Sequence, residues 1–205
     1  MVFIAFEGGD GAGKSTQVAA LASWLRERGH EVVLTREPGG TELGGRIRAA
    51  LLHGDHIGPR AEALLFAADR AHHVEQLIRP ALAQGQVVIT DRYSDSSVAY
   101  QGAGRALAVD EIAQLSRWAT GGLVPDLTVL LDVSPETGRR RRSGRDEDRM
   151  EAEAAEFHTR VRAHFLELAQ AAPGRYLLLD AGAPIADLSA AVSARVGELL
   201  QDAAP

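Results

Sequence analysis

A glycine-rich loop near the N-terminus carries the most specific chemistry in the sequence. Residues 8–15 read Gly-Gly-Asp-Gly-Ala-Gly-Lys-Ser and match the Walker A pattern G-x-x-x-x-G-K-[ST]. Glycines let backbone N–H groups turn toward a phosphate, Lys14 can reach the β- and γ-phosphates, and the Ser15 hydroxyl can bind Mg²⁺. We therefore expect a nucleoside triphosphate to contact the following residues: Gly8, Gly9, Asp10, Gly11, Ala12, Gly13, Lys14, Ser15 and Thr16.

Lys14 is the only lysine of the chain, and every other strong cation is an arginine. A guanine-specific switch protein normally has a lysine in an Asn-Lys-x-Asp motif, which this chain lacks, so the sequence disfavours that class. The formal net charge is -6, from 22 basic and 28 acidic residues. This balance disfavours a nonspecific binder of nucleic acid, and an anionic ligand therefore needs a local basic site.

Two further polar segments each follow an apolar run that predicts a buried strand. They are 36–41, which begins at Arg36, and 91–93, which reads Asp-Arg-Tyr. Ligands of open α/β sheets bind beyond the carboxyl ends of strands, so both segments are site candidates. Arg92 directly follows its strand and is well placed to hold an acceptor phosphate. Asp91 is either a carboxylate near the metal, together with Ser15, or a turn-forming aspartate.

A helical pattern is predicted from Arg60 to Gln84. At about 100° per residue, one stripe of this helix is apolar and is expected to face the core. It consists of Ala61, Leu64, Leu65 and Ala68, whereas the opposite side carries Glu62, Phe66, Asp69, Arg70 and His73. Phe66 could stack on an aromatic base while Arg70 donates to its carbonyl, or Phe66 could pack against another helix or a second copy of the chain.

An arginine run occupies 139–142, and Arg145 and Arg149 follow it. Four successive arginines point all round a helix and repel one another. The run is either a disordered charged loop or a mobile lid, at about 139–150, which closes over the nucleotide. A lid would bring guanidinium groups to the transferred phosphoryl group.

Apolar runs of strand length alternate with helical patterns along the chain. Strands are predicted at 2–7, 32–34, 86–90, 127–133 and 175–180, with the second one buried, and helices after the Walker loop, at 42–53, 60–84 and 109–120, and on both sides of the last strand. We expect an irregular stretch around Gly102 and Gly104. The alternation predicts an α/β fold, a doubly wound five-stranded parallel sheet with helices on both faces, in one domain spanning 1–205.

Composition supports this fold class. The chain has 205 residues, of which 45% are hydrophobic and 24% charged, as in a globular domain. Without cysteine it has no disulfide framework or thiolate metal site. No apolar run approaches the ~20 residues of a membrane-spanning helix, and the N-terminus lacks the basic region of a signal peptide, so we expect a cytoplasmic protein without a membrane partner.

In the order and spacing of these segments the chain resembles the thymidylate kinase family. The resemblance runs from Val2 to about Leu200. It rests on Phe6-Glu7-Gly8 with the Walker loop, Thr35-Arg36-Glu37-Pro38-Gly39-Gly40-Thr41, Asp91-Arg92-Tyr93, Ala99-Tyr100-Gln101-Gly102 and Asp148-Arg149-Met150-Glu151. It implies a P-loop nucleoside monophosphate kinase architecture, ATP and thymidine monophosphate (dTMP) as substrates, Mg²⁺ as cofactor, and a homodimer.

The resemblance also implies roles for single residues at the acceptor. Phe66 stacks on thymine, Arg70 bonds its carbonyl, Ser96, Ser97 and Gln101 face the base, Tyr100 crowds the sugar, and Asp10 meets the 3′-hydroxyl. Arg36, Arg48 and Arg92 hold the monophosphate, and Glu37 belongs to the same acceptor set. From the residues alone, Arg48 could equally be a surface arginine, and Asp10 must pair with Mg²⁺, Lys14 or a sugar hydroxyl.

Members of the family differ in where the catalytic arginine lies, inside the Walker loop or in the lid. Gly11 occupies the loop position, so the chain resembles the lid-arginine type found in bacteria. The expected catalytic cations are Lys14, Arg92, Arg141, Arg142, Arg145 and Arg149.

These observations predict transfer of the γ-phosphoryl group of ATP to dTMP, giving ADP and thymidine diphosphate for dTTP synthesis. The alternatives are another nucleoside monophosphate kinase and a nucleotide-binding module without catalysis. An acceptor that is already a phosphate oxyanion requires no general base.

Overall fold

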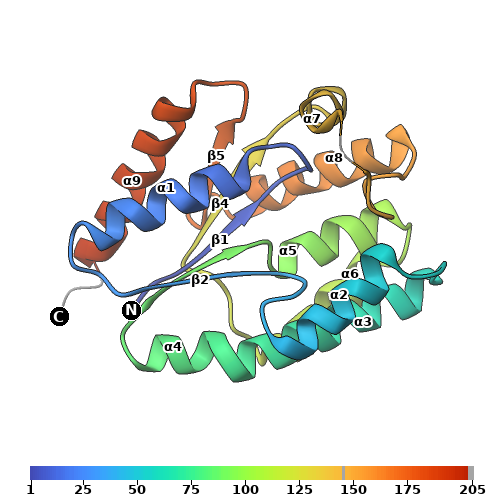
Figure 1. Ribbon diagram of the computed structural model, residues 1–205, viewed down its shortest axis with the longest axis horizontal. Helices are drawn as coiled ribbons and strands as arrows, with labels where there is room; N and C mark the ends of the chain where they lie inside the picture. Colours follow the sequence, from blue (N-terminus) through green and yellow to red (C-terminus); the bar gives the residue numbers. More distant parts are fainter. Residues whose placement is uncertain (145, 203–205) are drawn as a thin grey trace.

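The structure is a computed structural model, and it describes residues 1–144 and 146–202 (Figure 1). Within these residues, five parallel strands form one sheet in the order β2-β3-β1-β4-β5. Their bounds are β1 Phe3–Glu7, β2 Val32–Arg36, β3 Val87–Asp91, β4 Leu127–Asp132 and β5 Tyr176–Asp180. The predicted doubly wound sheet is confirmed, with strand ends shifted by one or two residues.

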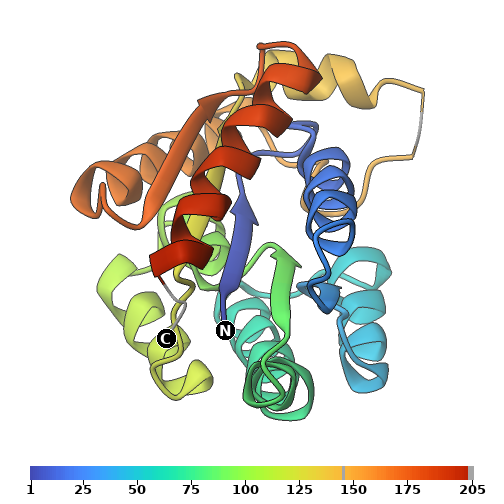
Figure 2. The same cartoon turned by 90° about the vertical axis from the view of Figure 1, so that its left-hand side faces the viewer.

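Helices cover both faces of the sheet because successive side chains of a strand point to opposite faces. On one face, α1 (Lys14–Arg26) and α9 (Ile185–Asp202) lie side by side and pack on Ile4 of β1 (Figures 1 and 2). On the other face, Phe3 contacts the helical rod described below. The remaining helices include α2 Glu42–His53, α6 Val109–Thr120, α7 Pro135–Arg142 and α8 Ala155–Ala171.

The second strand is less buried than predicted. Leu34 of β2 is 40% exposed, and Val32 and Val33 are only half-buried. The prediction of a buried strand was wrong because β2 lies at the edge of the sheet and pairs with β3 alone. An apolar run predicts a strand but does not fix its place in the sheet.

The predicted helix 60–84 is confirmed as one continuous rod. It consists of α3 (Pro59–His73), the wide-turned segment η1 (Val74–Ile78) and α4 (Arg79–Ala83). The helical turn widens just before Pro80, which has no backbone N–H to donate. In this wider turn, the Arg79 N–H donates to the Val74 carbonyl, five residues earlier.

The faces of α3 are largely the reverse of those predicted, although Leu65 of the predicted apolar stripe is half-buried and packs against the core. Leu64 is 59% exposed, and Ala61 and Ala68 are exposed with it. The opposite side is buried and includes Glu62 and Arg70. Hydrophobicity alone gave the wrong face because the polar side chains are buried as mutual ion pairs and hydrogen-bonded groups.

The stretch around Gly102 and Gly104 was predicted to be irregular, and it is helical. α5 (Ser94–Ser97) continues directly into the wide-turned segment η2 (Val98–Gly104). A Cβ atom on Gly104 would lie 2.6 Å from the ring of Phe157. This glycine therefore permits close packing of α8 on η2 rather than a break in the helix.

The loop from β1 to α1 lies beside α7 at the carboxyl ends of the strands (Figure 1). Figure 2 shows the same end from the side, with α7 and the segment after it projecting beyond the sheet. Within residues 1–144 and 146–202, no helix has the length and apolar character needed to cross a bilayer.

Candidate active site

One large cavity of about 710 Å³ opens at the carboxyl ends of the strands. Its walls come from the Walker loop, the segment after β2, α3, the segment after β3, and the predicted lid. Of the predicted site residues, the lining includes Asp10, Gly11, Gly13, Lys14, Ser15, Thr16, Arg36, Glu37, Arg48, Phe66, Arg70, Asp91, Arg92, Ser96, Ser97, Tyr100, Gln101, Arg141 and Arg142. The fold thus gathers segments far apart in the sequence around one space of ligand size.

The Walker loop is folded as its glycines predict. Gly8 has a positive φ of 131°, and a Cβ atom there would lie 2.3 Å from the carbonyl oxygen of Leu131. Gly13 has a φ of 92° and immediately precedes α1. Both positions therefore require glycine, and the loop closes on the N-terminus of a helix, where an anion is favoured.

Lys14 is buried in this loop. Its Nζ donates to the carbonyl oxygens of Gly8 at 3.1 Å and Gly9 at 3.0 Å. Burial, reinforced by the charge of Arg92, lowers the pKa of Lys14. The ammonium therefore lies within the loop, where it can exchange these carbonyl partners for phosphate oxygens.

Ser15 and Asp91 contact each other across 76 residues of sequence. The Ser15 hydroxyl donates to Asp91 Oδ2 at 3.1 Å. Hydroxyl and carboxylate oxygens are hard ligands of the kind that Mg²⁺ uses when phosphates and waters complete its shell. The chemistry of these two side chains fits a magnesium ion shared with the phosphates of a nucleotide.

Arg92 lies between the Walker loop and the rest of the cavity. It adopts a left-handed backbone conformation, with a φ of 72°, which is rare for a residue with a side chain. Its guanidinium donates to the Gly8 carbonyl at 3.1 Å and to Tyr100 Oη at 3.2 Å, and it pairs with Asp10. Strained backbone at such a position indicates a functional constraint.

Asp10 therefore has partners that differ from those expected. Sequence reasoning offered Mg²⁺, Lys14 or a sugar hydroxyl, whereas its carboxylate pairs with Arg92 and accepts from the Tyr100 hydroxyl at 3.1 Å. Burial raises the pKa of Asp10, but the charges of Arg92 and Lys14 bring it well below its usual range. The carboxylate stays ionised and orients both Arg92 and Tyr100.

Arg70 is held rigidly at the other end of the cavity. It is 2% exposed, and its Nε donates to Glu37 at 2.7 Å. Its two terminal nitrogens donate to Ser97 Oγ at 3.0 Å and to the Tyr93 carbonyl at 3.1 Å. Phe66 lines the same part of the cavity and is half-buried against α8 and its neighbours.

Glu37 positions Arg70 through this ion pair. It is buried between Arg70 and His73, whose Nδ1 lies 2.9 Å from Glu37 Oε1. The other ring nitrogen of His73 lies 2.6 Å from the Thr35 hydroxyl. His73 and Thr35 were not predicted as site residues, and the polar face of α3 was the signal that pointed to His73.

Ser96 does not point freely at a base. Its hydroxyl donates to Glu7 at 2.6 Å and accepts from Arg92 at 3.1 Å. Glu7 also accepts from the backbone N–H groups of Tyr93 and Ser96. Glu7 is fully buried, and burial, reinforced by Asp95, raises its pKa to about 7. Glu7 was not predicted as a site residue. Its position as a carboxylate at the end of an apolar strand was the signal that could have identified it.

Arg36 and Arg48 both line the cavity, so Arg48 is not simply a surface arginine. Arg48 donates to the Pro38 carbonyl at 2.9 Å. Burial and the neighbouring charge of Arg36 lower the pKa of Arg48. Together, these two cations create a local positive site on an acidic protein.

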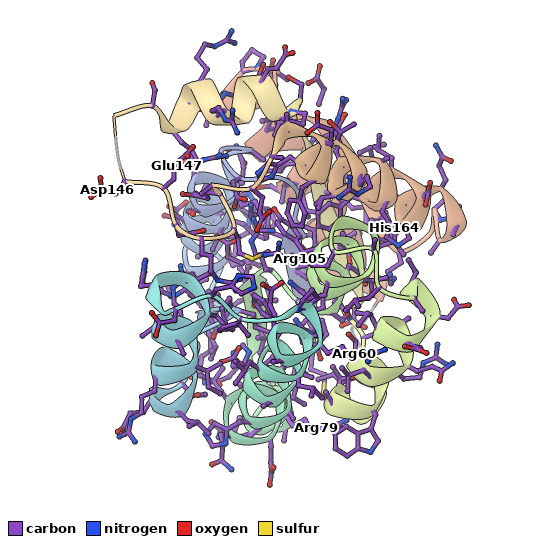
Figure 3. All side chains as sticks on the ribbon, turned by 90° about the vertical axis from the view of Figure 1, so that its right-hand side faces the viewer. Arg60, Arg79, Arg105, Asp146, Glu147 and His164 are labelled. Carbon is purple, nitrogen blue, oxygen red and sulfur yellow. The ribbon has the colours of Figure 1, made fainter. Side chains whose placement is uncertain are left out.

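The predicted lid begins as helix α7 and then projects from the body. Asp146 and Glu147 stand at its outer turn (Figure 3). Arg141 donates to the carbonyls of Gly11 at 3.3 Å and Ala181 at 2.9 Å, and Arg142 is buried beside Glu151 at 3.4 Å. Both line the cavity. Arg145 lies outside the described residues.

Arg149 is directed elsewhere than predicted. Its Nε donates to the Leu51 carbonyl at 2.8 Å, and its Nη2 lies 2.7 Å from Glu62 of α3. The guanidinium therefore anchors the end of the lid segment to α2 and α3 rather than reaching the Walker loop. An arginine in a charged run gives no indication of which carboxylate it will pair with in the fold.

Gly11 and Gly138 explain how closely α7 approaches the Walker loop. A Cβ atom on Gly11 would lie 2.5 Å from the Gly138 carbonyl oxygen, and one on Gly138 would lie 2.3 Å from that of Asp10. The arginine that some relatives carry in this loop would not fit here without moving α7. Arg141 of α7 reaches this position of the loop and donates to the Gly11 carbonyl.

The sheet order, the Walker loop and the second group of cations facing it define a P-loop kinase whose acceptor also carries a phosphate. The thymidylate kinase family model matches residues 6–192. The chain is 59% identical to a thymidylate kinase of Clavibacter sepedonicus over 97% of this chain and 96% of that protein. It is 58% identical to that of Leifsonia xyli subsp. xyli, covering 95% and 94%, and 51% identical to that of Synechococcus sp., covering 100% and 99%. The chain belongs to the thymidylate kinase family.

Proposed function

We propose that this protein transfers the γ-phosphoryl group of ATP to dTMP, yielding ADP and thymidine diphosphate. The observation that carries this proposal is one continuous cavity with Lys14 and the Walker loop at one end and Phe66 with Arg70 at the other. Arg92 lies between them. A single cavity lined by both groups suits two nucleotides bound phosphate to phosphate.

At the donor end, Ser15 and Asp91 would hold Mg²⁺ together with the ATP phosphates. The metal, when bound, withdraws charge from the phosphates. Lys14 neutralises the oxygens of the transferred group. A dTMP oxygen attacks the γ-phosphorus, a new P–O bond forms, and the bond to the β-phosphate oxygen breaks as ADP leaves.

At the acceptor end, Arg36, Arg48 and Arg92 would bind the dTMP phosphate. Thymine would stack on Phe66 and accept a hydrogen bond from Arg70. Because Asp10 holds the Arg92 guanidinium and the Tyr100 hydroxyl in place, the sugar meets a fixed surface, and Asp10 retains acceptor capacity for the 3′-hydroxyl. The attacking oxygen is already ionised, so positioning and charge neutralisation suffice.

We further propose one domain over 1–205 with a movable lid at about 139–150. Arg141 is the lid cation nearest the Walker loop through its bond to Gly11, and Arg142 shares the cavity wall. Arg145 remains a candidate from sequence alone. Closure of the lid would bring these guanidinium groups to the transferred phosphoryl group and exclude water.

A homodimer is proposed from the outer face of α2, α3 and α6. Three apolar side chains on these helices are exposed, Leu43 by 43%, Leu64 by 59% and Trp118 by 78%. The helices lie side by side (Figure 1). Large apolar side chains exposed on neighbouring helices are found at interfaces between copies of a chain. We propose a cytoplasmic location because ATP and nucleoside monophosphates are cytoplasmic metabolites.

A coupled ADP-release assay tests the proposed function. Wild-type protein with ATP and Mg²⁺ is offered dTMP, dUMP, dCMP, dGMP, dAMP or no acceptor. We expect ADP only with an acceptor and the highest kcat/KM with dTMP. ADP formation that is independent of the acceptor, or a clear preference for another monophosphate, would overturn the proposal.

A further inference from the structure

Glu62 is a fully buried carboxylate one helical turn before Phe66 on α3. It receives three side chains from two other segments of the chain, η2 with the residue that ends it and the segment after α7. Gln101 Nε2 donates to its Oε1 at 3.0 Å, Arg105 donates to both oxygens at 3.1 and 3.0 Å, and Arg149 lies 2.7 Å from Oε2. In Figure 3, Arg105 lies between α3 and α8, and its side chain is half-buried.

These partners keep Glu62 ionised. Burial raises its pKa, but hydrogen bonds from Arg105 and Gln101 outweigh burial and lower the pKa below the usual value. An ionised carboxylate accepts hydrogen bonds and donates none. With two arginines beside it, Glu62 is a fixed acceptor.

A fixed acceptor determines which way the Gln101 amide points. Gln101 must turn its NH₂ group toward Glu62, because the reverse orientation would place Oε1 against the carboxylate. Gln101 is 1% exposed and lines the large cavity. Among the described residues, none donates a hydrogen bond to Gln101 Oε1. The amide oxygen of Gln101 is therefore available to accept a hydrogen bond from a ligand.

Arg70 offers the complementary group beside it. Its guanidinium is bonded to Ser97, which lies four residues before Gln101 on the same helical stretch. Arginine can only donate. A donor next to an acceptor matches the edge of thymine or uracil, in which a carbonyl lies beside a ring N–H. Cytosine presents the reverse order, an amino group beside an unprotonated ring nitrogen.

We propose that Glu62 is a positioning residue that sets base specificity: by orienting the Gln101 amide it selects a pyrimidine whose ring N–H adjoins a carbonyl and rejects cytosine. The proposal rests on the proposed function, with dTMP bound between Phe66 and Arg70. A site whose buried polar groups are left unpaired by the wrong ligand can discriminate by ~10⁴ or more. Glu62 never touches the base.

Substitution of Glu62 by the isosteric amide tests this directly. In Glu62→Gln the partner can donate as well as accept, so the Gln101 amide is free to reverse. The readout is the ratio of kcat/KM for dTMP to that for 5-methyl-dCMP, which keeps the methyl group and the ring shape. We expect Glu62→Gln to lower this ratio at least tenfold, mainly through KM. An unchanged ratio would overturn the proposal.

Arg105→Gln is the matched control. This substitution removes one ion pair of Glu62 but keeps the other, with Arg149, so Glu62 stays ionised. We expect the selectivity ratio of Arg105→Gln to stay within threefold of wild type. Its loss of stability in urea should be similar to that of Glu62→Gln. If Arg105→Gln lowered the ratio as much as Glu62→Gln, loss of packing rather than amide orientation would explain the effect.

A double-variant cycle with Gln101→Leu shows whether Glu62 acts through Gln101. Gln101→Leu should lose selectivity, and Glu62→Gln added to it should lower the ratio no further. An additional loss in the double variant would contradict the proposal. If Glu62→Gln fails to fold, calorimetry on the wild-type protein compares the binding of N3-methyl-dTMP with that of dTMP. Binding of N3-methyl-dTMP that is at least tenfold weaker supports a hydrogen-bond acceptor of the protein that faces N3 of the base. Equal affinity contradicts the proposal.

The outcomes separate this inference from the proposed function. If wild type prefers another acceptor to dTMP, the proposed function fails. If wild type prefers dTMP and Glu62→Gln keeps the selectivity ratio, only the inference fails.

Discussion

The two ends of the cavity differ in how their cations are held. At the acceptor end, Arg70 is 2% exposed and has three hydrogen-bond partners, including the buried Glu37. At the lid end, Arg139 and Arg140 are exposed, and Arg141 is bonded to backbone carbonyls. At the acceptor end a buried carboxylate fixes Arg70, whereas α7 carries exposed arginines together with Arg142, which is buried beside Glu151.

This difference indicates a division of labour. Groups already fixed in the folded protein lose little freedom when a ligand binds, so the acceptor end is preorganised for recognition. Groups on a projecting segment can approach after both substrates are bound, which suits charges needed in the transition state. Recognition of the acceptor and acceleration of the reaction should therefore respond to different substitutions.

Lys14→Met should give the largest effect. It removes the ammonium that neutralises the transferred group, and kcat should fall by about 10³ or more. The chain should remain folded, and dTMP affinity should change little, because Lys14 serves the donor end. Steady-state kinetics and calorimetry with dTMP check both. Turnover within tenfold of wild type, a barrier change of only ~1.4 kcal/mol, would remove Lys14 from this role.

Asp91→Asn should act next most strongly and only through the metal. With Ser15 left as the protein's metal ligand, the Mg²⁺ concentration for half-maximal rate should rise about tenfold, and kcat should fall about 10²-fold. A Mg²⁺ titration at saturating ATP and dTMP measures this. An unaltered Mg²⁺ requirement would mean that Asp91 only shapes the turn after β3.

Arg70→Gln should raise KM for dTMP by about 30-fold while KM for ATP stays within twofold. The loss of one charged hydrogen bond to the base accounts for this size. Because the substitution removes the ion pair between Arg70 and the buried Glu37, urea unfolding must accompany the kinetics. If both KM values rose together, Arg70 would not read the base.

Glu7→Gln should give the smallest effect, and one visible chiefly in stability. Burial raises the pKa of Glu7 to about 7 from 4.5, so the folded protein binds more protons than the unfolded chain between these pH values. Its contribution makes stability fall as pH rises from about 4.5 to 7, by about 3 kcal/mol in all.

Urea unfolding at pH 5.5 and pH 8 checks this sign. The loss of stability between the two pH values should be smaller in Glu7→Gln than in wild type. Asp69, whose pKa burial and Glu37 raise to about 6, is present in both proteins, so its contribution cancels in the comparison. An identical pH dependence in the two proteins would show that Glu7 does not titrate in this range.

The sequence predicted the parts of the site that depend on local pattern. The Walker loop needs glycine where φ is positive, and Gly8 and Gly13 have it. The approach of Ser15 to Asp91 followed from the rule that strand ends meet at one edge of a parallel sheet. These inferences require only the chain order of strands, loops and helices.

What the sequence did not predict depends on partners distant along the chain. The polar face of α3 is buried because Glu62 meets Arg105 and Arg149, and no hydrophobic periodicity reports such pairing. Arg149 looked like a lid cation for the same reason. Asp10 was assigned without Arg92 as a partner, because only the fold places the two side chains together.

The most direct test of the division of labour uses the lid variant Arg141→Gln/Arg142→Gln. Two measurements are made side by side: the single-turnover rate with ATP and dTMP, and the calorimetric Kd for dTMP without ATP. We predict a rate lowered about 10³-fold, as for arginine fingers, and a Kd within threefold of wild type. An unchanged rate would make the arginine run a charged surface segment. A collapse of dTMP affinity would place the lid in the acceptor site and contradict the account.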